Sequence, residues 1–264
     1  MKVSRGRDAA HGKTGRTIVP LRKNTMEKIL LAMDGYKQNT YAIDFACYLA
    51  KLTHSRLTGV FLEGTPEGDE PGIQRQEEPE LMRQEEPEGD ILLESRFSDL
   101  IVVDPETSFR HIDKAFPGRF IQDVLLAAEC PVVVSPYSFD SLDEVIFAYN
   151  GTSSSVFAIK QFTYLFPEFK HKKAVVVSVR NGEGSAIQEQ FKMKEWLSAH
   201  YEEVDFVLLK GDASDELFGY LLERKNAIVV LGAYGRGILS RFLKPSHASL
   251  LLRTINLPIF IAHR

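Results

Sequence analysis

Short, continuous apolar runs alternate with stretches of helical periodicity along the second half of the chain. The apolar runs are VIFAYN (145–150), AVVVSVR (174–180), VDFVLLK (204–210), AIVVLGA (227–233) and PIFIAH (258–263), and the helical patterns lie near 154–165, 186–200, 213–224 and 247–254. Strands that are apolar on both faces are typical of a parallel sheet covered by helices on both sides. The pattern predicts a doubly wound α/β fold of five strands, with a ligand crevice beyond the carboxyl ends of the strands.

The same unit occurs twice along the chain. Matching segments in the two halves are KILLAMDG (28–35) with EVIFAYNG (144–151), SDLIVVD (98–104) with NAIVVLG (226–232), and CPVVVSP (130–136) with LPIFIAH (257–263). A long internal repeat of this kind indicates duplicated structural units. We therefore predict two Rossmann-like, doubly wound units in tandem, at 26–140 and 141–264.

The first unit is the shorter of the two. The offset between the halves is 116 residues at the first strand and 128 residues at SDLIVVD, so the first unit is 12 residues shorter between these points. That leaves no room for both the second helix and the third strand. We expect an incomplete first sheet that packs against the second unit for support. A substitute helix within 73–97 is the alternative.

Much of the segment between the second strand of the first unit and SDLIVVD is acidic and repetitive. Residues 63–90 hold eleven acidic residues, two arginines and four prolines, and RQEEPE occurs in them twice. A segment with so few apolar side chains cannot offset the entropy of ordering it. We predict a disordered, acidic, repetitive loop at 63–90.

The ends of the chain and its cysteines restrict the class of protein. Residues 1–25 carry seven Lys or Arg against one Asp. We expect a disordered basic extension there, with nucleic-acid or anionic-membrane binding as the alternative. No run approaches the roughly 18 apolar residues of a membrane helix. Cys47 and Cys130 show no pairing pattern and the histidines show no metal-ligand spacing, which favours a reducing compartment and argues against a structural zinc.

The end of the chain carries a family resemblance. A first strand that ends in Asp34-Gly35 and the stretch AIVVLGAYGRGILSRFLKPSHAS (227–249) resemble the universal stress protein family in its tandem two-domain form. The resemblance implies a cytoplasmic stress-response protein, either a dimer or a pseudo-dimer within one chain, and some members of the family bind ATP. No membrane and no specific nucleic acid is expected as a partner.

The resemblance also implies a nucleotide site in the second half. The matching positions are Asn150, Gly151, Gly232, Gly235, Arg236 and Ser246. Glycines let the backbone approach a ribose or a phosphate closely. A serine at a helix start meets the positive end of the helix dipole, which favours an anion. Mg²⁺ would enter only together with the nucleotide. Plain turns and an ordinary helix cap explain the same residues without any ligand.

Two residues depart from the family pattern in this half. Asn150 stands where the family has Asp, and an amide can still bond to a ribose hydroxyl or an adenine edge. Pro245 stands where the family has Gly, and proline removes a backbone donor. One charge-assisted hydrogen bond is worth roughly 1.5–3 kcal/mol, or about one to two decades in affinity. We therefore expect weakened ATP binding.

The first half departs further from the pattern. Asp104 and Thr107 replace the loop glycines, Gly118 aligns with Pro245, and Arg119 replaces the serine. A carboxylate at position 104 would repel phosphates. We expect no triphosphate in this half.

Catalysis has little support in the sequence. The serines at 153–155 have no histidine at a recognisable spacing, and Cys130 lies at the mouth of a buried strand, where a structural thiol is expected. The leading hypothesis is a non-catalytic stress-response regulator that binds an adenine nucleotide weakly in its second half. The alternatives are an interaction protein that has lost nucleotide binding and an ATP-cleaving enzyme in which Asp34 and Asp104 act as paired acids or Mg²⁺ ligands.

Overall fold

A computed structural model describes residues 26–34, 39–62, 87–107, 118–180, 187–232 and 254–262. The elements of the first half are β1 (Lys28–Asp34), α1 (Thr40–Thr53), β2 (Arg56–Leu62), α2 (Pro87–Ser95), β3 (Leu100–Val103), α3 (Arg119–Ala127) and β4 (Val132–Val134). Those of the second half are β5 (Glu144–Ala148), α4 (Ser153–Leu165), the 3-10 helix η1 (Pro167–His171), β6 (Lys173–Arg180), α5 (Gln190–Ser198), β7 (Glu203–Lys210), α6 (Ala213–Leu222), β8 (Ala227–Gly232) and β9 (Ile259–Ala262).

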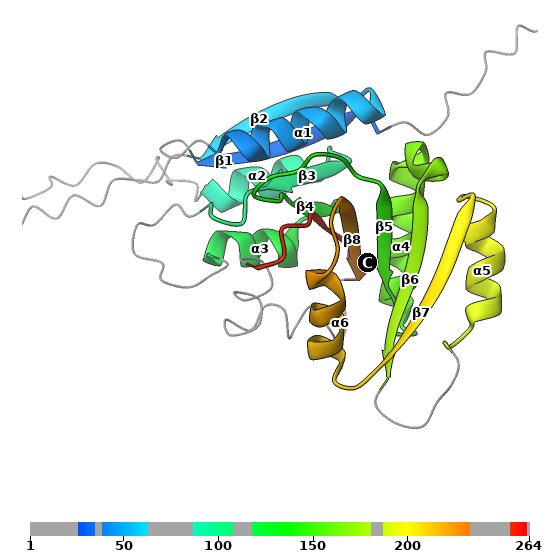
Figure 1. Ribbon diagram of the computed structural model, residues 1–264. Coiled ribbons are helices and arrows are strands. Elements are labelled where there is room, and N and C mark those ends of the chain that lie inside the picture. Colours follow the sequence, from blue (N-terminus) through cyan, green and yellow to red (C-terminus); the bar gives the residue numbers. More distant parts are fainter. Residues whose placement is uncertain are drawn as a thin grey trace, which may run out of the picture.

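The described strands form one sheet of nine, in the order β2-β1-β3-β4-β9-β8-β5-β6-β7 (Figure 1). Neighbouring strands are parallel within each half. The halves join where β4 and β9 run antiparallel, with Val133 opposite Phe260. Each half therefore contributes a parallel sheet to a single continuous sheet.

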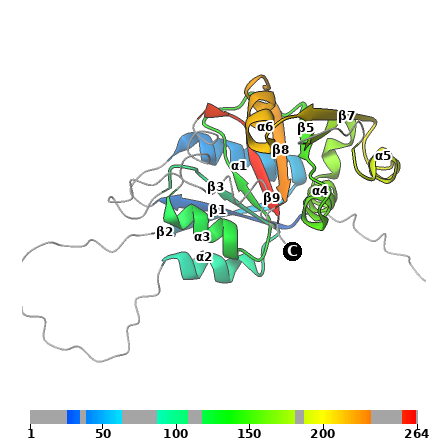
Figure 2. The same cartoon turned by 90° about the horizontal axis from the view of Figure 1, so that it is seen from below.

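Helices cover both faces of this sheet. One core contains buried residues of α2, α3 and α6, and the other contains buried residues of α1, α4 and α5. Helices α2 and α3 lie side by side, as Figure 2 shows. Successive strand residues enter opposite cores: on β8, Val229 and Leu231 belong to the first and Val230 to the second. The apolar runs of β5, β6, β8 and β9 are thus mostly buried on both sides, which confirms the predicted doubly wound α/β fold.

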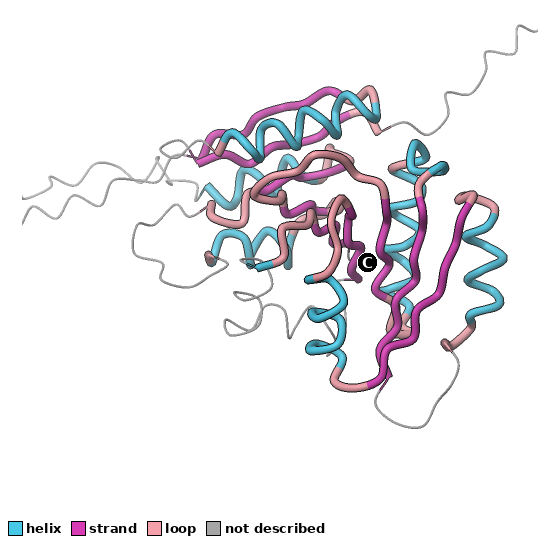
Figure 3. Tube along the Cα trace, in the orientation of Figure 1, coloured by secondary structure: helices cyan, strands magenta, loops and turns pink. Residues whose placement is uncertain are grey.

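All five strands predicted for the second half are present. Its strands follow the order β7-β6-β5-β8-β9, and α4, α5 and α6 begin and end within a few residues of the helical patterns in the sequence. In Figure 3 the strands β5, β6 and β7 run side by side. The predicted helix at 247–254 lies almost wholly outside the described residues.

The first half holds four described strands, in the order β2-β1-β3-β4. The described ranges hold no counterpart of α5 or β7, and residues 63–86, between β2 and α2, lie outside them, so the predicted incomplete sheet stays a prediction. Helix α2 precedes β3 as α6 precedes β8, at offsets of 126 residues between their starts and 127 between their ends, close to the 128 that relates SDLIVVD to NAIVVLG. The element retained is therefore the helix that leads into the last two strands of the unit.

The predicted loop at 63–90 is wrong at its carboxyl end. Helix α2 begins at Pro87, so residues 87–90 are helical. Proline and acidic residues are favoured in a first helical turn. The helix is held by Ile91, which is fully buried in the core that also contains α3. This matches the carboxyl end of the alternative, a helix within 73–97. Residues 1–25 and 63–86 lie outside the described residues.

Candidate functional site

The carboxyl ends of β5 and β8 lie next to each other. The two strands are parallel neighbours, with Phe147 of β5 opposite Val230 of β8. Beyond β5 the chain passes through Asn150 to helix α4, and β8 ends at Gly232. Helix α4 also packs against β8. Asn150 and Gly232, predicted from sequence to share a site, therefore lie close together at the carboxyl ends of β5 and β8.

A hydrogen-bonded turn joins β5 to α4. The side-chain oxygen of Asn150 accepts from the backbone N–H of Thr152 at 3.1 Å and from its hydroxyl at 2.7 Å. Gly151 between them has a φ of 80°, in the region that favours glycine. Thr152 is the N-cap of α4, and its hydroxyl accepts from the N–H of Ser155 at 3.3 Å. The amide oxygen of Asn150 is thus already used within the turn.

Gly232 is in very close contact with the first turn of α4. A Cβ atom at this position would lie 2.7 Å from both the carbonyl carbon and the carbonyl oxygen of Ser154. Only a residue without Cβ lets β8 end so near the helix. This packing explains the glycine by itself, and a role for Gly232 in admitting a ligand stays a prediction.

These residues line a small depression, whose walls are Ala148, Asn150, Thr152, Ser155, Leu231 and Gly232. Its cavity volume of about 10 Å³ has room for about one water molecule. Thr152 and Ser155 were missed as site residues from sequence. Their signal was the run of helix-capping residue types after Gly151, TSSS. Gly235, Arg236 and Ser246, as well as Pro245, lie outside the described residues, so their predicted roles are untested.

Comparison with known proteins identifies the fold. No protein-family model matches the sequence, and no curated protein matches it. Among solved structures, a universal stress protein from Archaeoglobus fulgidus is 15% identical, with a TM-score of 0.66 over 91% of this chain and 97% of that one. The fold is that of the universal stress proteins. A functionally unknown protein from Pseudomonas aeruginosa is 14% identical, with a TM-score of 0.54 over 91% of this chain and 94% of that one.

In the first half of this universal stress protein fold, a hydrogen-bonded carboxylate stands at the position equivalent to Gly232. Asp104, at the position of Gly232, is 6% exposed. Its carboxylate accepts from the side-chain amide of Asn39 at 2.8 Å and from the N–H of Glu106 at 3.0 Å. Asn39 is the N-cap of α1 and accepts from the N–H of Tyr41 at 3.0 Å. A carboxylate thus lies at the start of α1, where the second half has only a glycine.

Asn39→Ala is expected to lower the free energy of unfolding by about 1–2 kcal/mol, because it removes a helix cap and a donor to a buried carboxylate. Chemical denaturation followed by circular dichroism measures the change. Ser141→Ala is a control at a half-buried position whose hydroxyl donates to the exposed Asp143. Equal effects of the two changes would contradict a structural role for the Asn39–Asp104 pair.

The other first-half positions carry no glycine loop. Thr107 is buried, and its N–H donates to the carbonyl of Asp104 at 3.0 Å. Gly118 precedes α3, and the exposed Arg119 pairs with Asp123 on the same helix at 3.6 Å. Asp34 ends β1 as predicted, and Gly35 lies outside the described residues. Among the residues the structure describes, no group of three or more His, Cys, Asp or Glu side chains could hold a metal ion.

Cys130 is a buried thiol at the entry to β4. Burial, reinforced by the charge of Asp99, raises its pKa from 9.0 to about 12. A thiol with such a pKa is protonated at neutral pH and is a poor nucleophile. This agrees with the structural role expected from the sequence.

The buried thiol predicts an alkaline loss of stability. Its pKa is higher in the folded than in the unfolded chain, so its contribution is fully present below about pH 9 and is lost as the pH rises toward about 12. The expected slope is up to about 1.4 kcal/mol per pH unit. Tyr201 also has a raised pKa and contributes to the alkaline loss of stability. The contribution of Cys130 is therefore measured as the difference in free energy of unfolding between the wild type and Cys130→Ala, by chemical denaturation at increasing alkaline pH. Parallel curves for the two proteins would contradict the assignment.

No helix in the part of the chain that the structure describes is long and apolar enough to cross a membrane.

Proposed function

We propose that this protein is a non-catalytic, cytoplasmic regulator of a stress response, whose second half binds an adenine nucleotide, ATP, weakly. One observation carries the proposal. In the universal stress protein fold, the turn of Asn150 and the end of β8 at Gly232 meet beside the start of α4. The region beyond the carboxyl ends of parallel strands is where ligands bind in open α/β sheets.

The described residues offer neutral donors to such a ligand. The start of α4 is the positive end of a helix dipole, which favours an anionic group nearby. The amide nitrogen of Asn150 can donate to a ribose or adenine acceptor. The residues that line the depression include no Lys or Arg. Positive charge has to come from Arg236 and its neighbours in the sequence, and Mg²⁺ is expected to arrive only with the nucleotide.

Calorimetric titration with ATP and Mg²⁺, followed by an assay for released phosphate, tests the proposal. We expect weak binding of ATP without phosphate release. We also expect only one ATP per chain, because the carboxylate of Asp104 occupies the corresponding position of the first half. Two equal sites per chain would contradict the role given to Asp104. Turnover of ATP would instead support an ATP-cleaving enzyme.

Pro245→Gly is expected to tighten ATP binding by about one to two decades, because it restores a backbone donor where the sequence predicts the start of the last helix. The same titration measures it, and Pro258→Gly, a change of the same type beside β9, serves as the control. An unchanged dissociation constant in Pro245→Gly would remove proline as the cause of weak binding.

An interaction protein without a nucleotide is the second candidate. The observation that favours it is the contact between Gly232 and Ser154, which fills the space beside the glycine and leaves a depression of only about 10 Å³. Silence in the titration up to millimolar ATP supports this candidate.

A further inference from the structure

The two outer edges of the sheet are built differently. Strand β7 forms one edge and β2 the other (Figure 1). Strand β6, the counterpart of β2 in the second half, lies between β5 and β7. No strand in the described part of the chain pairs with the outer side of β2. Among the described strands, β2 is thus an edge strand, whereas its counterpart β6 is an interior strand.

The backbone groups that β2 turns outward can be assigned. The N–H of Arg56 donates to the carbonyl of Glu27 at 2.9 Å, toward β1. Alternate residues of a strand point their backbone groups in opposite directions. Leu57, Gly59 and Phe61 therefore direct their N–H and C=O groups away from β1. These groups are available to a further strand.

The side chains of β2 are less buried than those of its counterpart β6. Residues 174–178 of β6 are all buried, whereas no residue of β2 whose side chain is described is buried. Phe61 on β2 is 60% exposed. Val60 and Leu57 pack only partly against the two cores. The edge thus exposes apolar side chains along with its backbone groups.

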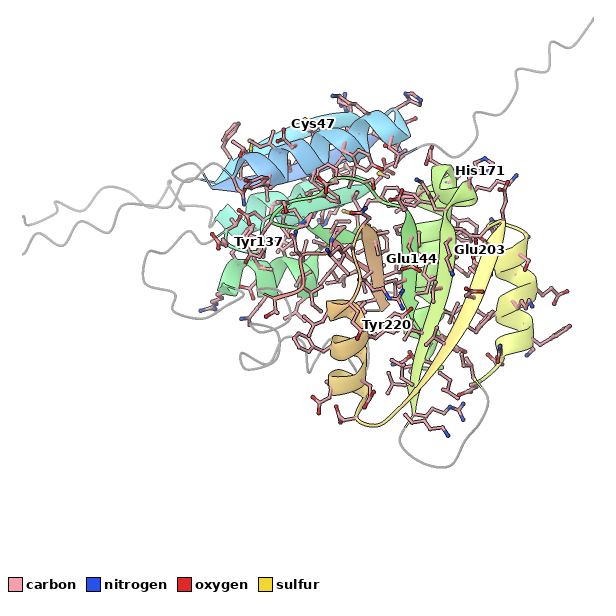
Figure 4. The ribbon with its side chains drawn as sticks, in the orientation of Figure 1. Cys47, Tyr137, Glu144, His171, Glu203 and Tyr220 are labelled. Carbon is pink, nitrogen blue, oxygen red and sulfur yellow. The ribbon has the colours of Figure 1, made fainter. Side chains whose placement is uncertain are left out.

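Charged residues protect β7 but are missing from most of β2. On β7, Glu203 and Asp205 both pair with Lys173, at 3.3 and 2.7 Å, and Glu203 is labelled on this edge in Figure 4. Between Leu57 and Leu62 β2 carries no charged residue and no proline. Natural proteins place such residues on exposed edges to prevent pairing. An edge that lacks them is suited to pairing.

We propose that β2 is a homodimer interface, in which it pairs antiparallel with β2 of a second copy of this chain. Centred on Gly59, the strand RLTGVFL is self-complementary: Leu57 lies opposite Phe61 of the partner, Thr58 opposite Val60, and Gly59 opposite itself. Aromatic and β-branched residues in such cross-strand pairs stabilise a sheet. The only close approach between identical residues involves glycine, which has no side chain to clash.

An antiparallel pair of strands already joins two parallel sheets within the chain. At β4 and β9 the same sheet already joins two parallel halves through one antiparallel pair. A second antiparallel joint at β2 would extend the sheet through two copies related by a two-fold axis, which is the usual symmetry of a homodimer. This inference does not depend on nucleotide binding, because four strands, β1, β3, β4 and β9, separate β2 from β8 and β5, where the candidate nucleotide site lies.

Sedimentation equilibrium of the full chain tests the proposal. Phe61→Lys is expected to raise the dissociation constant of the dimer about tenfold or more, since each dimer loses two Leu57–Phe61 pairs. Phe191→Lys on α5 is the matched control, because Phe191 is 82% exposed and lies beside the other edge. Its dissociation constant should equal that of the wild type. A wild type that stays monomeric at all concentrations, or a dimer that Phe61→Lys leaves unchanged, overturns the proposal.

Hydrogen exchange of the wild type provides a second test that needs no variant. The amides of Leu57, Gly59 and Phe61 should exchange more slowly as protein concentration rises. Those of Thr58 and Val60, which point toward β1, should be protected at every concentration. Concentration-independent exchange at the three outward amides in a protein that dimerises overturns the assignment of β2.

Discussion

Replacing Phe162 with alanine is expected to lower the free energy of unfolding by about 3–5 kcal/mol, the usual cost of removing a fully buried aromatic ring. Phe162 lies on α4 and is fully buried. Its ring lies 4.9 Å from Phe166, 5.5 Å from Phe169 and 5.2 Å from Phe260, between ring centroids. Phe260 belongs to β9, so the cluster ties α4 to the strand that joins the two halves.

The measurement is denaturant unfolding of the wild type and the variant under the same conditions. Tyr164→Ala on the same helix is the control, because Tyr164 is 43% exposed. Its substitution should cost less than about 1 kcal/mol, as is usual for surface positions. Similar losses for the two variants would show that the aromatic cluster does not hold α4 against the sheet.

Gly232→Ala is expected to cost about 2–3 kcal/mol, because the added Cβ would lie 2.7 Å from backbone atoms of Ser154. A flexible side chain could move aside cheaply, but the start of α4 is fixed by its cap and by its packing. To admit the methyl group, β8 and α4 must move apart. Thermal or denaturant unfolding measures the loss.

Gly219→Ala supplies the opposite case within the same chain. Gly219 lies in α6, and a Cβ there would meet nothing within 4 Å. Since alanine favours the helix over glycine, this variant should be more stable by roughly 0.5–1 kcal/mol. Destabilisation at position 219 together with tolerance at position 232 would contradict the contact between β8 and α4.

The pair of Asp104 and Asn39 shows where prediction from the sequence ended. The repeat aligned Asp104 with Gly232 and predicted a carboxylate that would repel phosphates. The sequence did not predict that Asn39 would donate to it, because the two residues are separated by 65 positions and come together only through the fold. The Asn39–Asp104 pair replaces, in the first half, the contact that Gly232 makes in the second.

Glycine roles were also ambiguous in the sequence. The same residue type suits a close ligand, a turn with positive φ or a close contact between elements. The structure assigns Gly151 to a turn, with a φ of 80°, and Gly232 to a contact with Ser154. Deciding among these roles requires the positions of atoms that are far away along the chain.

The alternation of apolar runs with helical periodicity, and its repetition along the chain, were enough to predict two doubly wound units and the shortening of the first. These features are local, since a strand buried on both faces must be apolar throughout and a helix covering it must be amphipathic. Only the tertiary structure decided that β4 pairs antiparallel with β9, that Asp104 meets Asn39, and that β2 has a free outer side among the described strands. Such pairings depend on which surfaces meet once the elements pack, and no run of neighbouring residues encodes them.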